Sequence, residues 1–298
     1  MADFYYKHAY PTILVIGNGF DLDMGLKSSW IHFMESKEFT LILKTNRLAI
    51  YLKKQQRLKN WIDIEAELKI YSKRGTIDKL DFHSEYFELL ETLNKFLKTL
   101  SYQTANESSI SFQLLQKFFS NDGIGESTLI IDFNYTDTIK ICADQIGVII
   151  NENRASNCHY IRVHGSLDQN NIVVGVEDGA DINDEHSFIR KSYHDACNPN
   201  DFGLLLKQSQ NIVFFGHSLG TADYHYFNEF FQSVLDEQES KNMFRNQKRN
   251  LTFIHKDEVS KIDLFTNLNA LTKGNMKELK NINVFNQYQT SSLKELPF

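Results

Sequence analysis

The sequence has 298 residues, a formal net charge of -6 and an isoelectric point near 5.9. Hydrophobic residues make up 42% and charged residues 23%, as in ordinary folded domains, which argues against a disordered or fibrous protein. A negatively charged chain has no overall positive field to attract nucleic acid. We therefore expect no nucleic-acid partner.

The apolar segments and the cysteines exclude further classes. Apolar runs such as Ile13–Ile16 and Ile212–Phe215 have the length of strands, far below the roughly 20 residues of a membrane helix, so we expect no membrane partner. The first residues show no basic region followed by an apolar block, which predicts a cytoplasmic protein. Three widely spaced cysteines form no Cys-x-x-Cys pair, and we expect reduced thiols and no metal: Cys142, Cys158 and Cys197.

The first predicted elements are a strand, a tight turn and a helix. Thr12–Ile16 is a short apolar run that leads directly into Gly17-Asn18-Gly19, and a helical pattern follows near Trp30–Glu35. Apolar residues then recur at helical spacing without strands between them. This pattern predicts a helical insertion, 36–120, after the first strand-helix unit.

Strand and helix signals alternate after the insertion. Helical patterns cover Asp137–Gln145, Tyr224–Leu235 and Glu258–Leu271. The predicted strands are Ser127–Phe133, Tyr160–Val163, Ile172–Val176, Asn211–Phe215, Leu251–Ile254 and, more weakly, Ile282–Phe285. Alternation of this kind predicts an α/β, Rossmann-like fold, with a mainly parallel sheet and helices on both faces. We expect one domain, 1–298, that contains the insertion.

Two of these strand ends carry polar residues suited to ligand binding. The glycines of Gly17-Asn18-Gly19 allow a close approach to a nucleotide phosphate, although a plain tight turn explains them as well. Asn134 follows the strand near Ile131, where doubly wound sheets bind ligands, but it also suits a turn or a helix cap.

Two further features have a functional and a structural interpretation. His164 follows the predicted strand Tyr160–Val163 and can accept a proton near neutral pH, or it can be an ordinary structural histidine. Trp61, Asp63 and Glu65 lie within the insertion. They form either an irregular segment that covers the site or an exposed acidic patch beside a core tryptophan.

The segment Gly216-His217-Ser218-Leu219-Gly220 fits the G-x-S-x-G pattern of serine hydrolases. In an esterase Ser218 would be the nucleophile, but the downstream His225 and His255 come without a convincing acid. The alternative is a glycine and serine turn that contacts ribose or phosphate, with Asp223 capping the next helix.

Taken together, these segments resemble the AbiH-type abortive-infection proteins of bacteria. The segments that carry the resemblance span most of the chain in order: Ile16-Gly17-Asn18-Gly19-Phe20-Asp21, Trp61-Ile62-Asp63-Ile64-Glu65, Phe133-Asn134-Tyr135-Thr136, Val163-His164-Gly165, and Gly216-His217-Ser218-Leu219-Gly220 followed by Asp223. The resemblance implies an antiphage defence protein.

The same order of segments is similar to the wider sirtuin-like group, which includes NAD-hydrolysing defence proteins. That resemblance implies that the loop of Gly17, Asn18, Gly19 and Asp21 binds NAD and that His164 is the catalytic histidine. It also places Asn134 near the nicotinamide ribose, and Gly216, Ser218 and Asp223 against ribose or phosphate. The chain lacks the four-cysteine zinc module of sirtuin deacylases, which puts protein deacylation in doubt.

These resemblances imply that NAD is the substrate and that nicotinamide and ADP-ribose are the products. Under this hypothesis the amides of the Gly17–Phe20 turn hold the pyrophosphate, and Phe20 belongs to the cofactor site. Asn134 orients ribose hydroxyls or water, His164 is the general base, and Asp21 lies near the developing positive charge. The main alternative is a nucleotide-binding sensor or scaffold without turnover, and the sequence leaves open a homo-oligomer or a regulatory partner.

Overall fold

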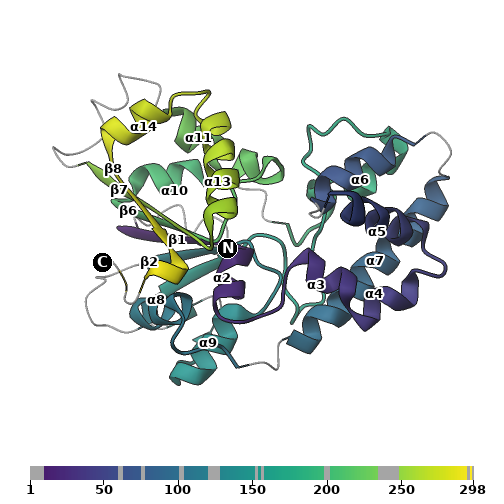
Figure 1. Cartoon of the computed structure of the whole chain (residues 1–298), viewed down its shortest axis with the longest axis horizontal. Coiled ribbons are helices and arrows are strands. Elements are labelled where there is room, and N and C mark those ends of the chain that lie inside the picture. Colours follow the sequence, from purple (N-terminus) through teal and green to yellow (C-terminus); the bar gives the residue numbers. More distant parts are fainter. Residues whose placement is uncertain are drawn as a thin grey trace.

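A six-stranded parallel sheet forms the centre of the structure (Figure 1). The computed structural model describes residues 10–59, 63–74, 78–100, 104–119, 128–151, 154–155, 158–197, 202–233, 248–293 and 296. Trp61, whose role the sequence leaves open, lies outside these residues.

The parallel strands have the order β5-β2-β1-β6-β7-β8. Numbered along the chain, this is the 3-2-1-4-5-6 order of dinucleotide-binding Rossmann folds. Strands β3 and β4 add an antiparallel edge beside β5. The strands are β1 (Thr12–Ile16), β2 (Thr128–Asp132), β3 (Ile150–Asn151), β4 (Arg154–Ala155), β5 (Cys158–Arg162), β6 (Asn211–Phe215), β7 (Arg249–His255) and β8 (Asn283–Gln289).

Helices cover both faces of the sheet, and short 3₁₀ helices (η) lie in the connections. The α-helices are α2 (Asn18–Asp23), α3 (Trp30–Glu35), α4 (Lys37–Ile42), α5 (Arg47–Lys59), α6 (Ile64–Ser72), α7 (Lys79–Leu100), α8 (Ile110–Phe119), α9 (Thr138–Ile146), α10 (Gly203–Gln208), α11 (Tyr224–Ser233), α13 (Glu258–Leu271) and α14 (Met276–Ile282). The 3₁₀ helices are η1 (Asp184–Ile189), η2 (Lys191–Tyr193), η3 (Thr221–Asp223) and η4 (Thr290–Ser292).

The alternation of side chains along β1 explains the two helical layers. Ile13 and Val15 join a buried cluster with α10, α11, α13 and α14, whereas Leu14 and Ile16 join a second cluster with α2, α8 and α9. Because successive side chains of a strand point to opposite faces, one apolar run supplies both cores. This arrangement confirms the predicted α/β, Rossmann-like fold.

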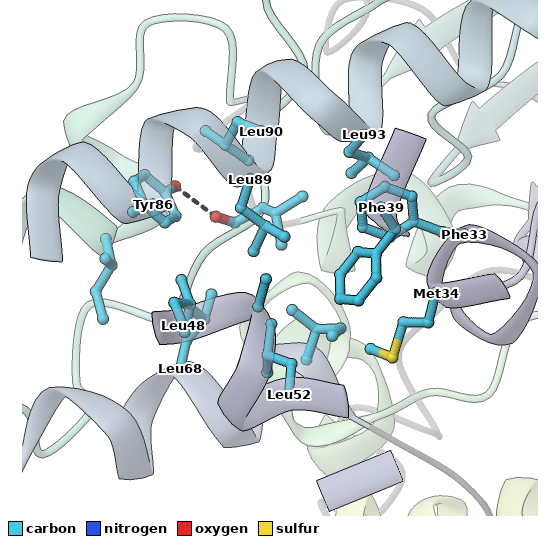
Figure 2. Packing of buried hydrophobic residues seen from close by; sticks show 14 of the residues in the cluster. Phe33, Met34, Phe39, Leu48, Leu52, Leu68, Tyr86, Leu89, Leu90 and Leu93 are labelled. Atoms are coloured by element: carbon cyan, nitrogen blue, oxygen red, sulfur yellow. Dashed lines mark hydrogen bonds between the residues drawn. The ribbon is translucent and has the colours of Figure 1, made fainter. Parts of the chain in front are cut away.

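Helices α3 to α7 form a lobe beside the sheet with a hydrophobic core of its own (Figure 1). Figure 2 shows this core, in which Phe33 and Phe39 pack near Leu93 of α7. The segment after β5 also contributes to it, because the Tyr86 hydroxyl donates a 2.6 Å hydrogen bond to the Val174 carbonyl. Within the predicted insertion, 36–120, helix α8 differs from α4–α7 by packing on the sheet. We call α3–α7 the helical lobe.

One predicted strand is wrong. Ile172–Val176 forms no strand and has only an isolated bridge between Val176 and Arg190. Its apolar side chains resemble those of a strand because Ile172, Val174 and Val176 are buried in the core of the helical lobe. Among the described residues, no helix has the length and apolar character needed to cross a membrane.

Candidate active site

The carboxyl ends of four neighbouring parallel strands lie in register at one edge of the sheet. Ile16, at the end of β1, is aligned with Asp132 of β2 and with Phe215 of β6. Asp132 is in turn aligned with Arg162 of β5. The chain runs from β1 towards β5 on one side and from β6 towards β8 on the other, so the order reverses between β1 and β6. Open α/β sheets bind ligands at this kind of position.

The turns after β1 and β6 pack against each other at this reversal. A Cβ atom added to Gly17 would lie 2.8 Å from the Cα of His217, and one added to Gly216 would lie 2.3 Å from the Phe20 nitrogen. The main-chain N–H groups of Gly17 and Gly19 donate to the carbonyls of Phe215 and Gly216, and Phe20 donates to Gly17. These three N–H groups therefore have acceptors within the protein, and the glycines permit close packing of the two turns.

Asp21 holds the turn that follows β2. Its side chain is 1% exposed and accepts hydrogen bonds from the Asn134 amide at 2.8 Å, from the Thr136 hydroxyl at 2.5 Å and from the Thr138 hydroxyl. Burial raises the pKa of Asp21 to about 6, although these hydroxyl donors oppose the shift. Asp21 therefore fixes the orientation of the Asn134 side chain, and its place near the developing charge stays a prediction.

Ionisable side chains of β2 and β5 also contact this turn at its two ends. Asp132 accepts a 2.9 Å hydrogen bond from the main-chain N–H of Asn134, and burial raises the pKa of Asp132 to about 8. Arg162 lies 2.8 Å from Asp137, which starts α9. Both ends of the turn that carries Asn134 are thus fixed by side chains of β2 and β5.

A second cluster is centred on Asp223. Its Oδ1 lies 3.4 Å from Nε2 of His164 and 3.0 Å from Nζ of Lys191, and its Oδ2 lies 3.5 Å from Nε2 of His217. Burial acts to raise the pKa of Asp223, but Lys191 and the two histidines outweigh it and hold this pKa well below its ordinary value. Asp223 thus contacts the predicted catalytic histidine directly, a contact that the sequence did not predict, and its contact with ribose or phosphate stays a prediction.

His164 is buried and neutral. Its side chain is 4% exposed, and burial, followed by the charge of Lys191, lowers its pKa to about 4. A neutral imidazole can accept a proton, as a general base requires. Its Nδ1 atom is buried without a hydrogen-bond partner among the described residues.

Lys191 joins the Asp223 cluster to the helical lobe. Its Nζ lies 2.9 Å from Glu65 in the first turn of α6, and its side chain is 3% exposed. Lys191 was not predicted from the sequence, because the lysine lies in no motif and its two acidic partners are distant in the chain. Glu65 has a defined place in this ion-pair network, and Asp63 caps α6 by accepting from the Ala66 N–H.

The two clusters meet at the turn after β2. The ring of Phe133 lies 5.5 Å from the His164 ring and 4.3 Å from the His217 ring, centroid to centroid. The Tyr135 ring lies 6.0 Å from that of His164. Asn134 is therefore flanked in the chain by two residues whose rings lie against that of His164, which places the Asp21 and Asp223 clusters next to each other.

Ser218 lies beside this site but lacks the surroundings of a nucleophile. Its side chain is exposed, and among the described residues no histidine is hydrogen-bonded to its hydroxyl. Both ring nitrogens of His217 are engaged, since Nδ1 accepts from the Leu219 N–H at 3.0 Å and Nε2 faces Asp223. The left-handed residues of this turn are Gly216, with φ of 63°, and Leu219, with φ of 52°, whereas the strained position of a hydrolase elbow is the serine.

The comparisons with known proteins identify the family. A family model described as bacteriophage abortive infection AbiH matches residues 13–245. This match runs from β1 to beyond α11 and includes both clusters of the site. No match was found among curated proteins. Because the family model covers well over half of the sequence, the chain belongs to the AbiH family of bacteriophage abortive-infection proteins.

Proposed function

We propose that the protein binds NAD at the carboxyl edge of the sheet and hydrolyses the bond between nicotinamide and ribose. One observation carries this proposal: Asn134 and His164 follow the adjacent strands β2 and β5 of a sheet with the dinucleotide-binding strand order. In such folds the turns after the first and fourth parallel strands approach the dinucleotide. These positions correspond here to the turns at Gly17–Gly19 and Gly216–Gly220.

In the proposed reaction, water attacks C1′ of the ribose while the bond to the nicotinamide nitrogen breaks. Nicotinamide leaves with the bonding electron pair, and the remaining ADP-ribose gains the hydroxyl group. His164 is neutral because its pKa lies near 4, so it can take the proton that the water loses. Asn134 orients the ribose hydroxyls or the water, and Asp21 keeps the Asn134 amide in one orientation.

Nicotinamide release from NAD tests this function. We expect release by the wild-type protein and a loss of about a hundredfold or more in both His164→Ala and Asn134→Ala. His255→Ala is a matched control, because His255 is also buried at the carboxyl end of a parallel strand, β7, but lies outside both clusters. Release that persists in His164→Ala, with all variants folded, would contradict the proposed mechanism.

A nucleotide sensor without turnover is the second candidate function. The burial of His164, which is 3% exposed, favours it because a base that substrate and water cannot reach performs no chemistry. This candidate predicts saturable NAD binding with no nicotinamide release, and His164→Ala that binds NAD as the wild type does. Both candidate functions therefore require NAD binding, and only the hydrolase releases nicotinamide.

A further inference from the structure

Asp223 is surrounded by donors from three parts of the fold. His164 follows β5, His217 follows β6, and Lys191 belongs to η2. Lys191 is the nearest of the three, at 3.0 Å, and its side chain is 3% exposed. Burying a lysine costs free energy unless its charge is paired, so we expect Lys191 to have a specific role at this position.

We propose that Lys191 is a positioning residue for His164: together with Asp223 it holds His164 as a neutral imidazole with its proton on Nε2, which leaves Nδ1 as the basic atom. This inference rests on the proposed function only in giving His164 the role of base. The tautomer and the role of Lys191 follow from contacts within the chain.

The hydrogen bonds around Asp223 assign the proton positions. Leu219 donates its N–H to Nδ1 of His217, so Nδ1 of His217 carries no proton and its Nε2–H faces Asp223. His164 likewise directs Nε2 towards Asp223, whose carboxylate can only accept. The proton of neutral His164 therefore lies on Nε2. Its Nδ1 is then a buried acceptor without a partner among the described residues, as expected of an atom that accepts a hydrogen bond from a water or a ribose hydroxyl during the reaction.

Burial is the largest cause that keeps His164 neutral, and the charged groups around it add to this effect or oppose it. Asp223 of η3 attracts a proton to His164, whereas Lys191 of η2 opposes it, and His217 after β6 faces the same carboxylate as a neutral imidazole. The other described neighbours include the uncharged rings of Phe133 and Tyr135 from the turn after β2 and of Tyr226 from α11. Cys197 forms an isolated bridge with His164, and burial raises the pKa of its thiol. Without Lys191, burial would still disfavour the charged imidazole, but no positive charge would oppose the Asp223 carboxylate, and the imidazole would become protonated at a higher pH.

Glu65 connects this arrangement to the helical lobe. It lies 2.9 Å from Lys191 and comes from α6, whereas Asp223 comes from the connection after β6. Burial, partly offset by Lys191, raises the pKa of Glu65 to about 7. Lys191 thus lies between two carboxylates: Asp223 beside His164, which is firmly ionised, and Glu65 on the helical lobe, which has the higher pKa. Asp223 is therefore the partner that orients Lys191.

The test is NMR of the full chain labelled with ¹⁵N in its histidines, recorded without NAD. Long-range ¹H–¹⁵N correlations report which ring nitrogen carries the proton, and His164→Gln assigns the signals. In the wild type we expect a protonated Nε2 and an unprotonated Nδ1 on His164. In Lys191→Met we expect the pKa of His164 to rise by about one unit or more, which is a tenfold change in proton affinity.

Lys207→Met is the matched control, because Lys207 is also a mostly buried lysine, 8% exposed, and pairs with Glu229 away from the site. It should leave the pKa of His164 unchanged. A wild-type proton on Nδ1 would overturn the proposal, as would an unchanged His164 pKa in Lys191→Met. The wild-type tautomer decides the matter if Lys191→Met does not fold. Because NAD is absent, a failure of NAD hydrolysis would contradict the proposed function without touching this result.

Discussion

Asp21 accepts a 2.8 Å hydrogen bond from the side-chain amide of Asn134, although 113 positions separate the two residues. The contact joins helix α2, which follows β1, to the turn that follows β2. Because β1 and β2 are adjacent and in register, their following segments meet at one edge of the sheet. The strand order therefore brings Asp21 and Asn134 together, and their hydrogen bond fixes the orientation of the Asn134 side chain.

Asp21→Asn tests whether this orientation matters. The substitution replaces one acceptor oxygen with an NH₂ group, so at least one donor from Asn134, Thr136 or Thr138 loses its partner. We expect NAD hydrolysis to fall by roughly ten- to a hundredfold with the fold retained. Asp23→Asn is the control from the same helix, because Asp23 bonds Ser111 instead, and its activity should stay near that of the wild type. Equal activity in both variants would remove the role assigned to Asp21.

Gly216→Ala tests the close packing of the two turns. Gly216 has a φ of 63°, and an added Cβ would lie 2.3 Å from the Phe20 nitrogen. We expect a loss of about 3 kcal/mol or more in the free energy of unfolding, measured with denaturant. Gly274→Ala is matched in backbone conformation, with φ of 84°, but has open space around the added Cβ, and it should cost about 1 kcal/mol. Similar losses would show that the turns are not tightly packed.

Asp132→Asn should change how stability depends on pH. Burial raises the pKa of Asp132 from 3.8 to about 8, so the folded protein keeps a proton that the unfolded chain releases between these values. This group therefore favours folding at low pH, and its contribution is lost as the pH rises towards 8. We expect the substitution to reduce the decline in unfolding free energy between pH 5 and 8 by on the order of 2 kcal/mol. Parallel pH profiles of the two proteins would contradict the assigned pKa.

Ser218→Ala separates the proposed hydrolase from a serine esterase. The exposed hydroxyl has no hydrogen-bonded histidine among the described residues, so we expect no labelling of wild-type Ser218 by a fluorophosphonate probe. Ser218→Ala should retain NAD hydrolysis within a fewfold of the wild type. Specific labelling that disappears in Ser218→Ala would instead support the esterase.

The sequence predicts the elements of the sheet better than the segments around it. Apolar runs with turn residues at their ends locate β1, β2, β5 and β6, because a strand buried on both faces needs a nearly continuous apolar sequence. Ile172–Val176 has the same apolar character but packs into the helical lobe without strand partners. An apolar run in the sequence indicates that its residues are buried, but it does not indicate which elements cover them.

The site shows a similar division. Motifs point to Asp21, Asn134, His164 and Asp223, and the structure brings these residues into two touching clusters. No motif in the sequence predicts the ion pair between Lys191 and Asp223, because it depends on how η2 lies relative to η3, the segment after β6. Sequence patterns identified the residues at strand ends, whereas Lys191, the buried partner of Asp223, required the tertiary structure.

Calorimetric titration of the purified protein with NAD is the decisive measurement, because the hydrolase and the sensor both require this binding. We expect saturable binding to one site per chain, with weaker binding in Asn134→Ala and unchanged binding in His255→Ala. The absence of binding at millimolar NAD by folded wild-type protein would contradict the assignment of the site.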